Sequence, residues 1–111
     1  MGFITKNYYK EDFDFLRHYG FTYYYSNECW TITETYGFDE ITVSITNNGE
    51  DVEVSVGDRN FTSFTKRYAF KMNAENVDEK DYIDELDEKV TTFLEEQGYD
   101  AFHNIDNRYR D

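Results

Sequence analysis

The chain has one cysteine and two histidines, the residues from which a thiol nucleophile and its base would have to come. Such catalysis needs a nucleophile, a base and an orienting group that meet in space. Cys29 falls on the polar side of a predicted strand, whereas His18 ends a predicted helix that packs on the other face. No motif joins them. We therefore interpret Cys29 as an incidental thiol and His18 as a surface histidine.

Metal and cofactor motifs are also missing from the sequence. His103 has no second ligand at a spacing typical of zinc sites. No segment has the alternating oxygen ligands around a glycine that a calcium loop requires. The stretch DVEVSVGDRN, residues 51–60, lacks the glycine pattern of a phosphate-binding loop. We expect no metal and no cofactor.

Carboxylates are abundant, but acid-base catalysis needs one that is buried in a cleft with a raised pKa. The carboxylates of this chain fall mainly on the faces predicted to be exposed. We therefore predict that the protein is not an enzyme. Buried titratable groups that converge in a pocket would favour the opposite interpretation.

The charge is strongly one-sided. The chain has 24 acidic residues against 11 Lys and Arg, a net charge of −13. Residues 75–111 carry 13 acidic and 4 basic groups, a net −9, whereas residues 41–74 carry 4 of each. This sign repels phosphate backbones and anionic membranes, so we expect direct binding of neither nucleic acid nor lipid.

The stretch DEKDYIDELDEKVTTFLEEQG, residues 78–98, predicts an amphipathic helix that starts at a cap between Asn76 and Asp78 and ends at Gly98. One face of this helix is mostly apolar and should dock onto the core: Tyr82, Ile83, Leu86, Val90, Phe93, Leu94 and Gln97. The opposite face is acidic and is our candidate partner-binding site: Asp78, Asp81, Asp84, Glu85, Glu88, Glu95 and Glu96.

An acidic helix face is most simply a solvated surface, but two features favour a function. Asp81 with Glu85, and Asp84 with Glu88, are like-charged pairs four residues apart, each destabilising by roughly 0.2 to 0.5 kcal/mol. A face needed only for solubility could mix the two signs. The helix is about 27 Å long with carboxylates every ~5.4 Å turn, a scale comparable to the phosphates of a DNA strand.

The first residues predict a second helix. TKNYYKEDFDFLRHYGF, residues 5–21, has Thr5 as N-cap and a buried stripe of Tyr9, Phe13 and Leu16. Gly20 is expected to end it in a left-handed cap, followed by Phe21 as the apolar contact.

The middle of the chain predicts a meander of antiparallel strands whose register follows from three turns. The expected pairs are Ile45 with Val52, Val43 with Val54 and Ile41 with Val56 across Asn48-Gly49; Ile32 with Ile41 and Trp30 with Val43 across Tyr36-Gly37; and Tyr23 with Trp30 and Phe21 with Ile32 across Ser26-Asn27. All three turns place apolar residues on one face, which agrees with a single buried side.

The buried face should comprise Phe21, Tyr23, Trp30, Ile32, Ile41, Val43, Ile45, Val52, Val54 and Val56. The other face is polar and should be solvated or used for docking: Thr22, Tyr24, Cys29, Thr31, Thr33, Thr42, Ser44, Thr46, Asp51, Glu53 and Ser55. FTSFTKRYAFKM, residues 61–72, predicts a fifth strand with Phe64, Tyr68, Phe70 and Met72 on one side. Lys66 interrupts that alternation, which indicates either an edge strand or a bulge.

The expected architecture is α+β: an N-terminal helix, an antiparallel meander sheet of four to five strands and a C-terminal acidic helix, in two layers. We expect one domain over residues 1–98 and a partly docked tail over residues 99–111. One cysteine and no apolar run long enough for a leader or a membrane span favour a soluble, cytoplasmic protein.

In size, acidic charge and the order helix, sheet, helix, the chain resembles small acidic phage-encoded inhibitors, such as anti-CRISPR proteins and other DNA mimics. The resemblance rests on composition and layout and assigns no residue a role. It implies a non-enzymatic inhibitor in the cytoplasm of a bacterial host, with a basic, nucleic-acid-binding protein as its partner.

Two hypotheses of function follow from the sequence. In the first, the acidic helix occupies a basic, nucleic-acid-binding surface of a partner protein. In the alternative, the protein is a structural or interaction module that oligomerises or docks through the Thr-rich face of its sheet, with Tyr24 as anchor, or through a sheet edge. The sequence leaves the oligomeric state open.

Overall fold

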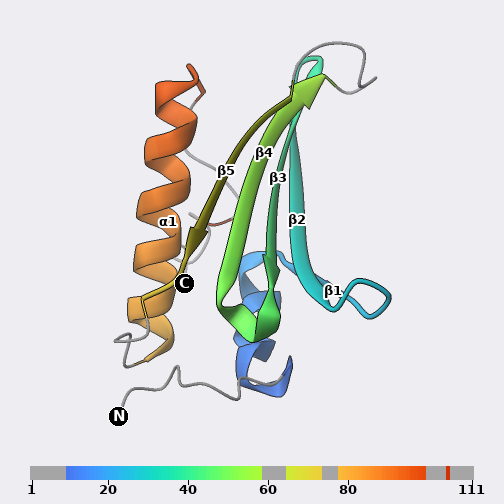
Figure 1. Cartoon of the computed structure of the whole chain (residues 1–111), viewed down its shortest axis with the longest axis vertical. Coiled ribbons are helices and arrows are strands. Elements are labelled where there is room, and N and C mark those ends of the chain that lie inside the picture. The colour runs from blue at the N-terminus through green and yellow to red at the C-terminus, as the bar shows by residue number, and fades with distance from the viewer. Residues whose placement is uncertain (1–9, 59–64, 74–77, 100–104, 106–111) are drawn as a thin grey trace.

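The fold is built on an antiparallel sheet of five strands (Figure 1). The structure is a computed structural model that describes residues 10–58, 65–73, 78–99 and 105. Its elements, in chain order, are the 3-10 helix η1 (Lys10–Tyr19), β1 (Thr22–Tyr24), β2 (Cys29–Tyr36), β3 (Asp39–Thr46), the short 3-10 helix η2 (Asn47–Gly49), β4 (Asp51–Asp58), β5 (Thr65–Lys71) and α1 (Glu79–Glu96).

The strands follow one another in sequence order, so the sheet is a meander with β1 and β5 at its edges. Its apolar residues alternate along each strand and fall on one side, as expected for a sheet with one buried face. All ten residues predicted for that face are buried except Tyr23, which is half-buried. The α+β class and the antiparallel sheet are therefore confirmed.

The strand register is confirmed for two of the three hairpins. Tyr23 pairs with Trp30 between β1 and β2, and Ile45 pairs with Val52 between β3 and β4. The second of these hairpins closes through η2 and Glu50 rather than through Asn48-Gly49 alone. Phe21 precedes β1 and is outside the described ladder, although it is buried.

The register between β2 and β3 was predicted wrongly. Trp30 pairs with Ile45 and Ile32 with Val43, a slip of two residues from the expected pairs. The turn has Gly37 at its first central position with φ +59 and Phe38 at its second, an arrangement typical of type II′ turns. A slip of two residues leaves every side chain on its own face, so the apolar pattern could not distinguish the two registers.

The fifth strand is an edge strand, one of the two alternatives left open. It pairs with β4 in an unbroken register over Thr65–Lys71, so there is no bulge within those residues. Lys66 lies opposite Val56 on the apolar side of the ladder, yet its side chain is exposed. An edge position allows a lysine there because its ammonium group can reach solvent. The predicted Phe64 lies outside the described residues.

The first helix is a 3-10 helix with a kink at Phe13, not the α-helix we expected. Phe13 and Leu16 align on one side when a turn takes three residues, and Phe15 is buried as well. Asp, Phe, Tyr and His favour an α-helix only weakly. The predicted glycine cap is present, because Phe21 N–H donates to the carbonyl of Leu16 and Gly20 has φ +95. Thr5 and Tyr9 lie outside the described residues.

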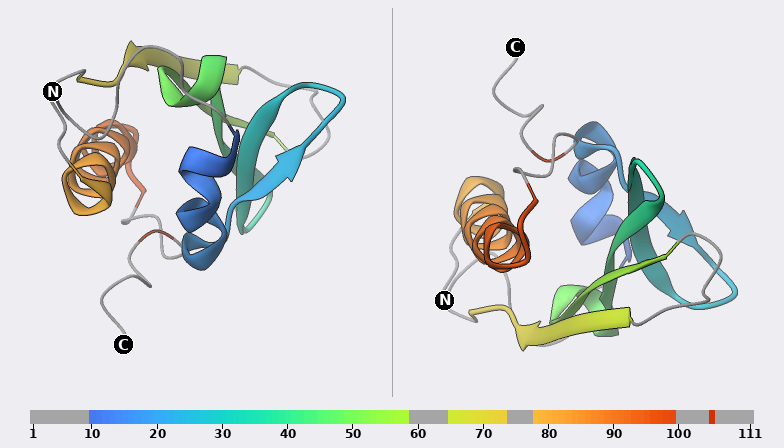
Figure 2. Two further views of the ribbon diagram at one scale, coloured as in Figure 1. Left: turned by 90° about the horizontal axis from the view of Figure 1, so that it is seen from below. Right: turned by 90° about the horizontal axis from the view of Figure 1, so that it is seen from above.

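The C-terminal helix agrees with its predicted limits. Asp78 is the N-cap, and the carbonyl of Leu94 accepts from Tyr99 N–H after Gly98 at φ +92. Figure 2 shows α1 and η1 against the same face of the sheet. Their buried side chains join those of the sheet in one core, which also includes Ile105. The core thus fixes α1 by one side only and leaves its acidic side outward.

Candidate functional site

The acidic side of α1 is the candidate site, and the structure divides its seven predicted residues by role. Asp78 accepts a hydrogen bond from Asp81 N–H at 2.8 Å and caps the helix. Glu85 accepts from Asn73 N–H at 3.1 Å and 3.2 Å through its two oxygens, and its side chain is only 15% exposed. Glu85 therefore ties α1 to the residues that follow β5, a role that helical spacing alone did not indicate.

The two lysines of the helix neutralise two of its carboxylates. Lys80 lies 2.7 Å from Asp84, and Lys89 lies 3.0 Å from Glu85, each four residues apart. The hydrogen bond to Asp84 raises the pKa of Lys80 above its ordinary value, because the carboxylate favours the charged ammonium. The lysines thus offset part of the predicted repulsion between like charges.

The remaining predicted carboxylates stay available. Within the part of the chain that the structure describes, Asp81, Glu88, Glu95 and Glu96 form no ion pair. Glu88, Glu95 and Glu96 are exposed, and Asp81 is half-buried. These four residues extend from the first turn of the helix to its last, so the free negative charge spans the length of α1.

A hollow of about 300 Å³ lies where α1 passes β5. Its lining combines aromatic rings, carboxylates and one lysine: Tyr68, Glu88, Lys89, Thr92, Phe93 and Glu96. Tyr68 and Phe93 are stacked, with ring centroids 5.4 Å apart and planes at 27°. We call this hollow the β5–α1 seam.

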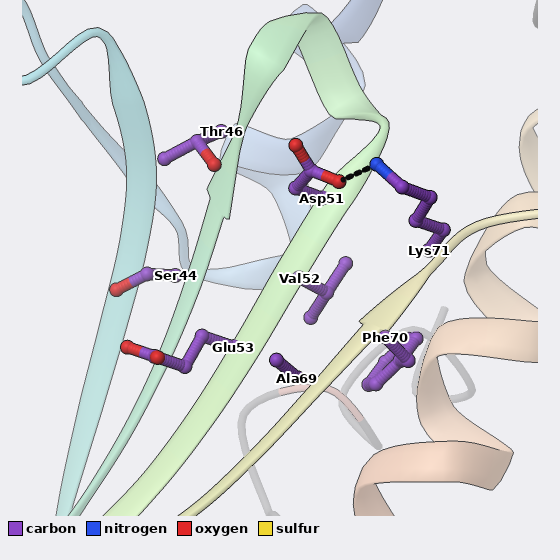
Figure 3. Close-up of a pocket in the computed structure, with 8 residues that line it drawn as sticks. All are labelled: Ser44, Thr46, Asp51, Val52, Glu53, Ala69, Phe70 and Lys71. Carbon is purple, nitrogen blue, oxygen red and sulfur yellow. Dashed lines mark hydrogen bonds and ion pairs between the residues drawn. The ribbon is translucent and has the colours of Figure 1, made fainter.

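A second hollow, of about 600 Å³, lies on the polar face of the sheet across β3, β4 and β5 (Figure 3). It is lined by Ser44, Thr46, Asp51, Val52, Glu53, Ala69, Phe70 and Lys71. Lys71 donates to Asp51 at 2.6 Å, and this hydrogen bond raises the pKa of the lysine above its ordinary value. The lysine is thus held in its charged form within an ion pair.

The predicted separation of Cys29 and His18 is confirmed. The helix η1, which contains His18, lies on the apolar side of the sheet, whereas Cys29 lies on its polar side. The expected exposure of Cys29 was wrong, since the residue is only 6% exposed. Its Sγ lies 3.3 Å from Thr31 Oγ1, and Tyr24 lies opposite on β1. Neighbouring side chains therefore shield the thiol on the polar face. His103 lies outside the described residues.

The sequence did not predict a polar contact between Tyr99, which follows α1, and Asp39, the first residue of β3. The hydroxyl of Tyr99 donates to Asp39 Oδ2 at 2.5 Å, across 60 positions of the chain. This hydrogen bond, followed by burial and the carboxylate charge, raises the pKa of Tyr99 to about 12. A pairing over such a separation leaves no local sequence signal.

Two further features concern the residues that the structure describes, namely metal ligands and membrane-spanning helices. Among them, no group of three or more His, Cys, Asp or Glu side chains is placed to hold a metal ion. No described helix has the length and apolar character needed to cross a membrane.

Comparison with known proteins found no matching family model, no matching curated protein and no matching solved structure.

Proposed function

We propose that the chain is a non-enzymatic acidic binding protein, in which the outer face of α1 occupies a basic, nucleic-acid-binding surface of a partner protein. If the protein acts for a phage, its role would be to inhibit a defence protein of the host, in the manner of anti-CRISPR proteins. Its place of action would then be the bacterial cytoplasm.

The observation that carries the proposal is the negative charge, without described ion pairs, along the outer side of one helix that is anchored in the core. Five residues of α1 are fully buried and fix the helix to the core: Tyr82, Ile83, Leu86, Val90 and Leu94. Four carboxylates on its other sides form no ion pair with another described residue. Preorganised charges of one sign steer association with a basic surface and fix its orientation.

Competition with DNA tests this proposal. A panel of purified nucleic-acid-binding proteins, including an RNA-guided nuclease, would be bound to labelled duplex and titrated with the chain at low and high salt. We expect the chain to displace duplex from at least one member of the panel at low salt, and the effect to fade as salt screens the charges. The proposal would be contradicted if no duplex is displaced, or if the displacement is the same at low and high salt.

Variants in which carboxylates are replaced by amides identify the surface that competes with DNA. The triple variant Asp81→Asn, Asp84→Asn and Glu95→Gln removes two carboxylates that have no described ion pair and the carboxylate that is paired with Lys80. It should weaken competition by about threefold to a hundredfold, since each surface ion pair lost with the partner contributes roughly 0.2 to 1 kcal/mol. A matched control removes three exposed carboxylates elsewhere: Asp14→Asn, Glu28→Gln and Glu53→Gln. If both variants lose competition equally, the net charge of the protein is responsible rather than the acidic face of α1.

The polar face of the sheet supports a second candidate function, docking or oligomerisation. Its hollow of about 600 Å³ lies beside β5, an edge strand whose outer side pairs with no other strand among the described residues. Thr31→Lys or Thr42→Lys would place a charge in the middle of this face. If dimerisation measured by ultracentrifugation is insensitive to salt and is lost in these variants, this candidate is favoured over the first.

A further inference from the structure

A contact beside the β5–α1 seam shows how this protein holds a cation over an aromatic ring. Lys89 Nζ lies 5.0 Å from the ring centroid of Phe70 and 3.0 Å from a carboxylate oxygen of Glu85. Ring and carboxylate act together here, since the ring face attracts the ammonium group and the carboxylate balances its charge. The lysine remains only 34% exposed in this position.

Next to this contact, the seam offers the same two kinds of group again. Tyr68 and Phe93 are half-buried and stacked, and both line the hollow of about 300 Å³. Glu88 and Glu96 lie two helical turns apart on α1 and line the same hollow. Neither carboxylate forms an ion pair with another residue that the structure describes.

From this geometry we propose that the seam between β5 and α1 binds an arginine side chain of the basic partner. The guanidinium group stacks on the exposed surface of Tyr68 and Phe93 and pairs with Glu88 or Glu96. This inference rests on the proposed function and deepens it, because it names the side chain that the acidic helix recognises and the place where it does so.

Arginine fits the seam better than lysine for two physical reasons. Its planar guanidinium stacks on aromatic rings and donates two parallel hydrogen bonds to a carboxylate, and it is more weakly hydrated than an ammonium group. Two positive charges also lie near the site. Lys89 is paired with Glu85, and Lys66 is an exposed residue two positions before Tyr68 on β5. Because these lysines repel a second cation, binding at the seam requires stacking on the aromatic rings in addition to attraction by the carboxylates.

Calorimetric titration with capped hexa-arginine and hexa-lysine peptides tests the proposal, because the two probes carry equal charge. We expect the unaltered protein to bind the arginine peptide about threefold to tenfold more tightly at low salt, in line with a single cation–π contact. NMR titration of the same protein should shift the ring signals of Tyr68 and Phe93, a result that depends on no mutation.

Two sets of variants locate the site. Tyr68→Thr or Phe93→Leu should abolish the preference for arginine, whereas Tyr24→Thr removes an exposed tyrosine from the other face of the sheet and should preserve it. Glu88→Gln with Glu96→Gln should weaken arginine binding more than Glu79→Gln with Glu95→Gln does. Both pairs remove two negative charges from α1, and only the first pair lines the seam.

Each outcome separates this inference from the proposed function. Equal binding of the two peptides, weakened by Asp81→Asn, Asp84→Asn and Glu95→Gln, overturns the arginine site and leaves the acidic face in place. An arginine preference that survives Tyr68→Thr and Phe93→Leu also overturns the site. An arginine preference that is lost in Tyr68→Thr and Phe93→Leu, combined with no displacement of duplex from any protein of the panel, keeps the arginine site and overturns the proposed function instead. Failure of both peptides to bind at low salt overturns both.

Discussion

At the scale of single residues, Gly49 is constrained both by its backbone conformation and by its neighbours. Its φ is +92, and an added Cβ would lie 2.3 Å from the Cζ atom of Phe13. Its carbonyl accepts a buried hydrogen bond from the Tyr82 hydroxyl at 2.8 Å. The turn between β3 and β4 thus lies between η1 and α1, and a glycine is required there for both backbone conformation and space.

We predict that Gly49→Ala lowers the free energy of unfolding by about 2 to 4 kcal/mol, through left-handed strain and overpacking against Phe13. Gly98→Ala is the matched control, since Gly98 has the same φ of +92 but nothing within 4 Å of an added Cβ. It should lose only about 1 to 2 kcal/mol. Urea denaturation measures both. Equal losses would show that the Phe13 contact contributes nothing.

The contact of Tyr99 with Asp39 predicts a dependence on alkaline pH. The folded protein raises the pKa of Tyr99 from 10.0 to about 12, so the stabilising contribution of the neutral phenol is complete below pH 10. It is lost as the pH rises from 10 to about 12 and the phenol ionises beside the carboxylate. Tyr99→Phe should therefore destabilise the protein near neutral pH. The difference in free energy of unfolding between this variant and the unaltered protein should shrink as the pH rises from 10 to about 12.

Ultraviolet absorbance of tyrosinate follows the titration directly. The difference between the unaltered protein and Tyr99→Phe should show a midpoint near pH 12. Asp39→Asn should lower that midpoint, because it removes the carboxylate that accepts the hydrogen bond. A difference midpoint near 10.0, the ordinary value, would be inconsistent with the contact.

At the scale of elements, α1 combines two kinds of carboxylate that look alike in the sequence. Glu85 bonds Asn73 N–H and Lys89, whereas Glu88, one turn further along, is exposed. The difference arises because Asn73, two positions after the end of β5, lies beside Glu85. Glu85 therefore has a structural role, whereas Glu88 lies on the surface that is available for binding.

We expect Glu85→Ala to lower the free energy of unfolding by about 1 to 2 kcal/mol, since it removes a partly buried acceptor and leaves Asn73 N–H to be solvated. Glu88→Ala, the matched control, should change it by less than about 0.5 kcal/mol, as is usual for an exposed residue. Thermal or urea unfolding distinguishes them. If both variants unfold alike, Glu85 has no structural role.

At the scale of the whole molecule, the dominant feature is a net charge of −13 around a single core. Charge of one sign destabilises the compact state through self-repulsion. We predict that raising NaCl from about 10 mM to about 0.5 M increases the thermal midpoint, because salt screens exposed charges at these distances. The variant Asp81→Asn, Asp84→Asn and Glu95→Gln should show a smaller increase. A fall with salt would mean that the ion pairs outweigh the repulsion.

The sequence by itself determined which face of each strand is buried, and it located both ends of α1 to within a few positions. Both follow from local rules, namely the alternation of apolar residues along strands and the capping residues Asp78 and Gly98. It also located the acidic excess on α1. These features depend on neighbours within a few positions, so reading along the chain was enough to find them.

Only the tertiary structure decided the register of β2 on β3, the 3-10 form of η1 and the separate roles of Glu85 and Glu88. A slip of two residues keeps every side chain on its face, so register depends on which turn residue takes the positive φ. The seam of Tyr68 and Phe93 joins an edge strand to a helix 25 positions later. Contacts of this kind depend on how distant elements pack, which no local pattern encodes.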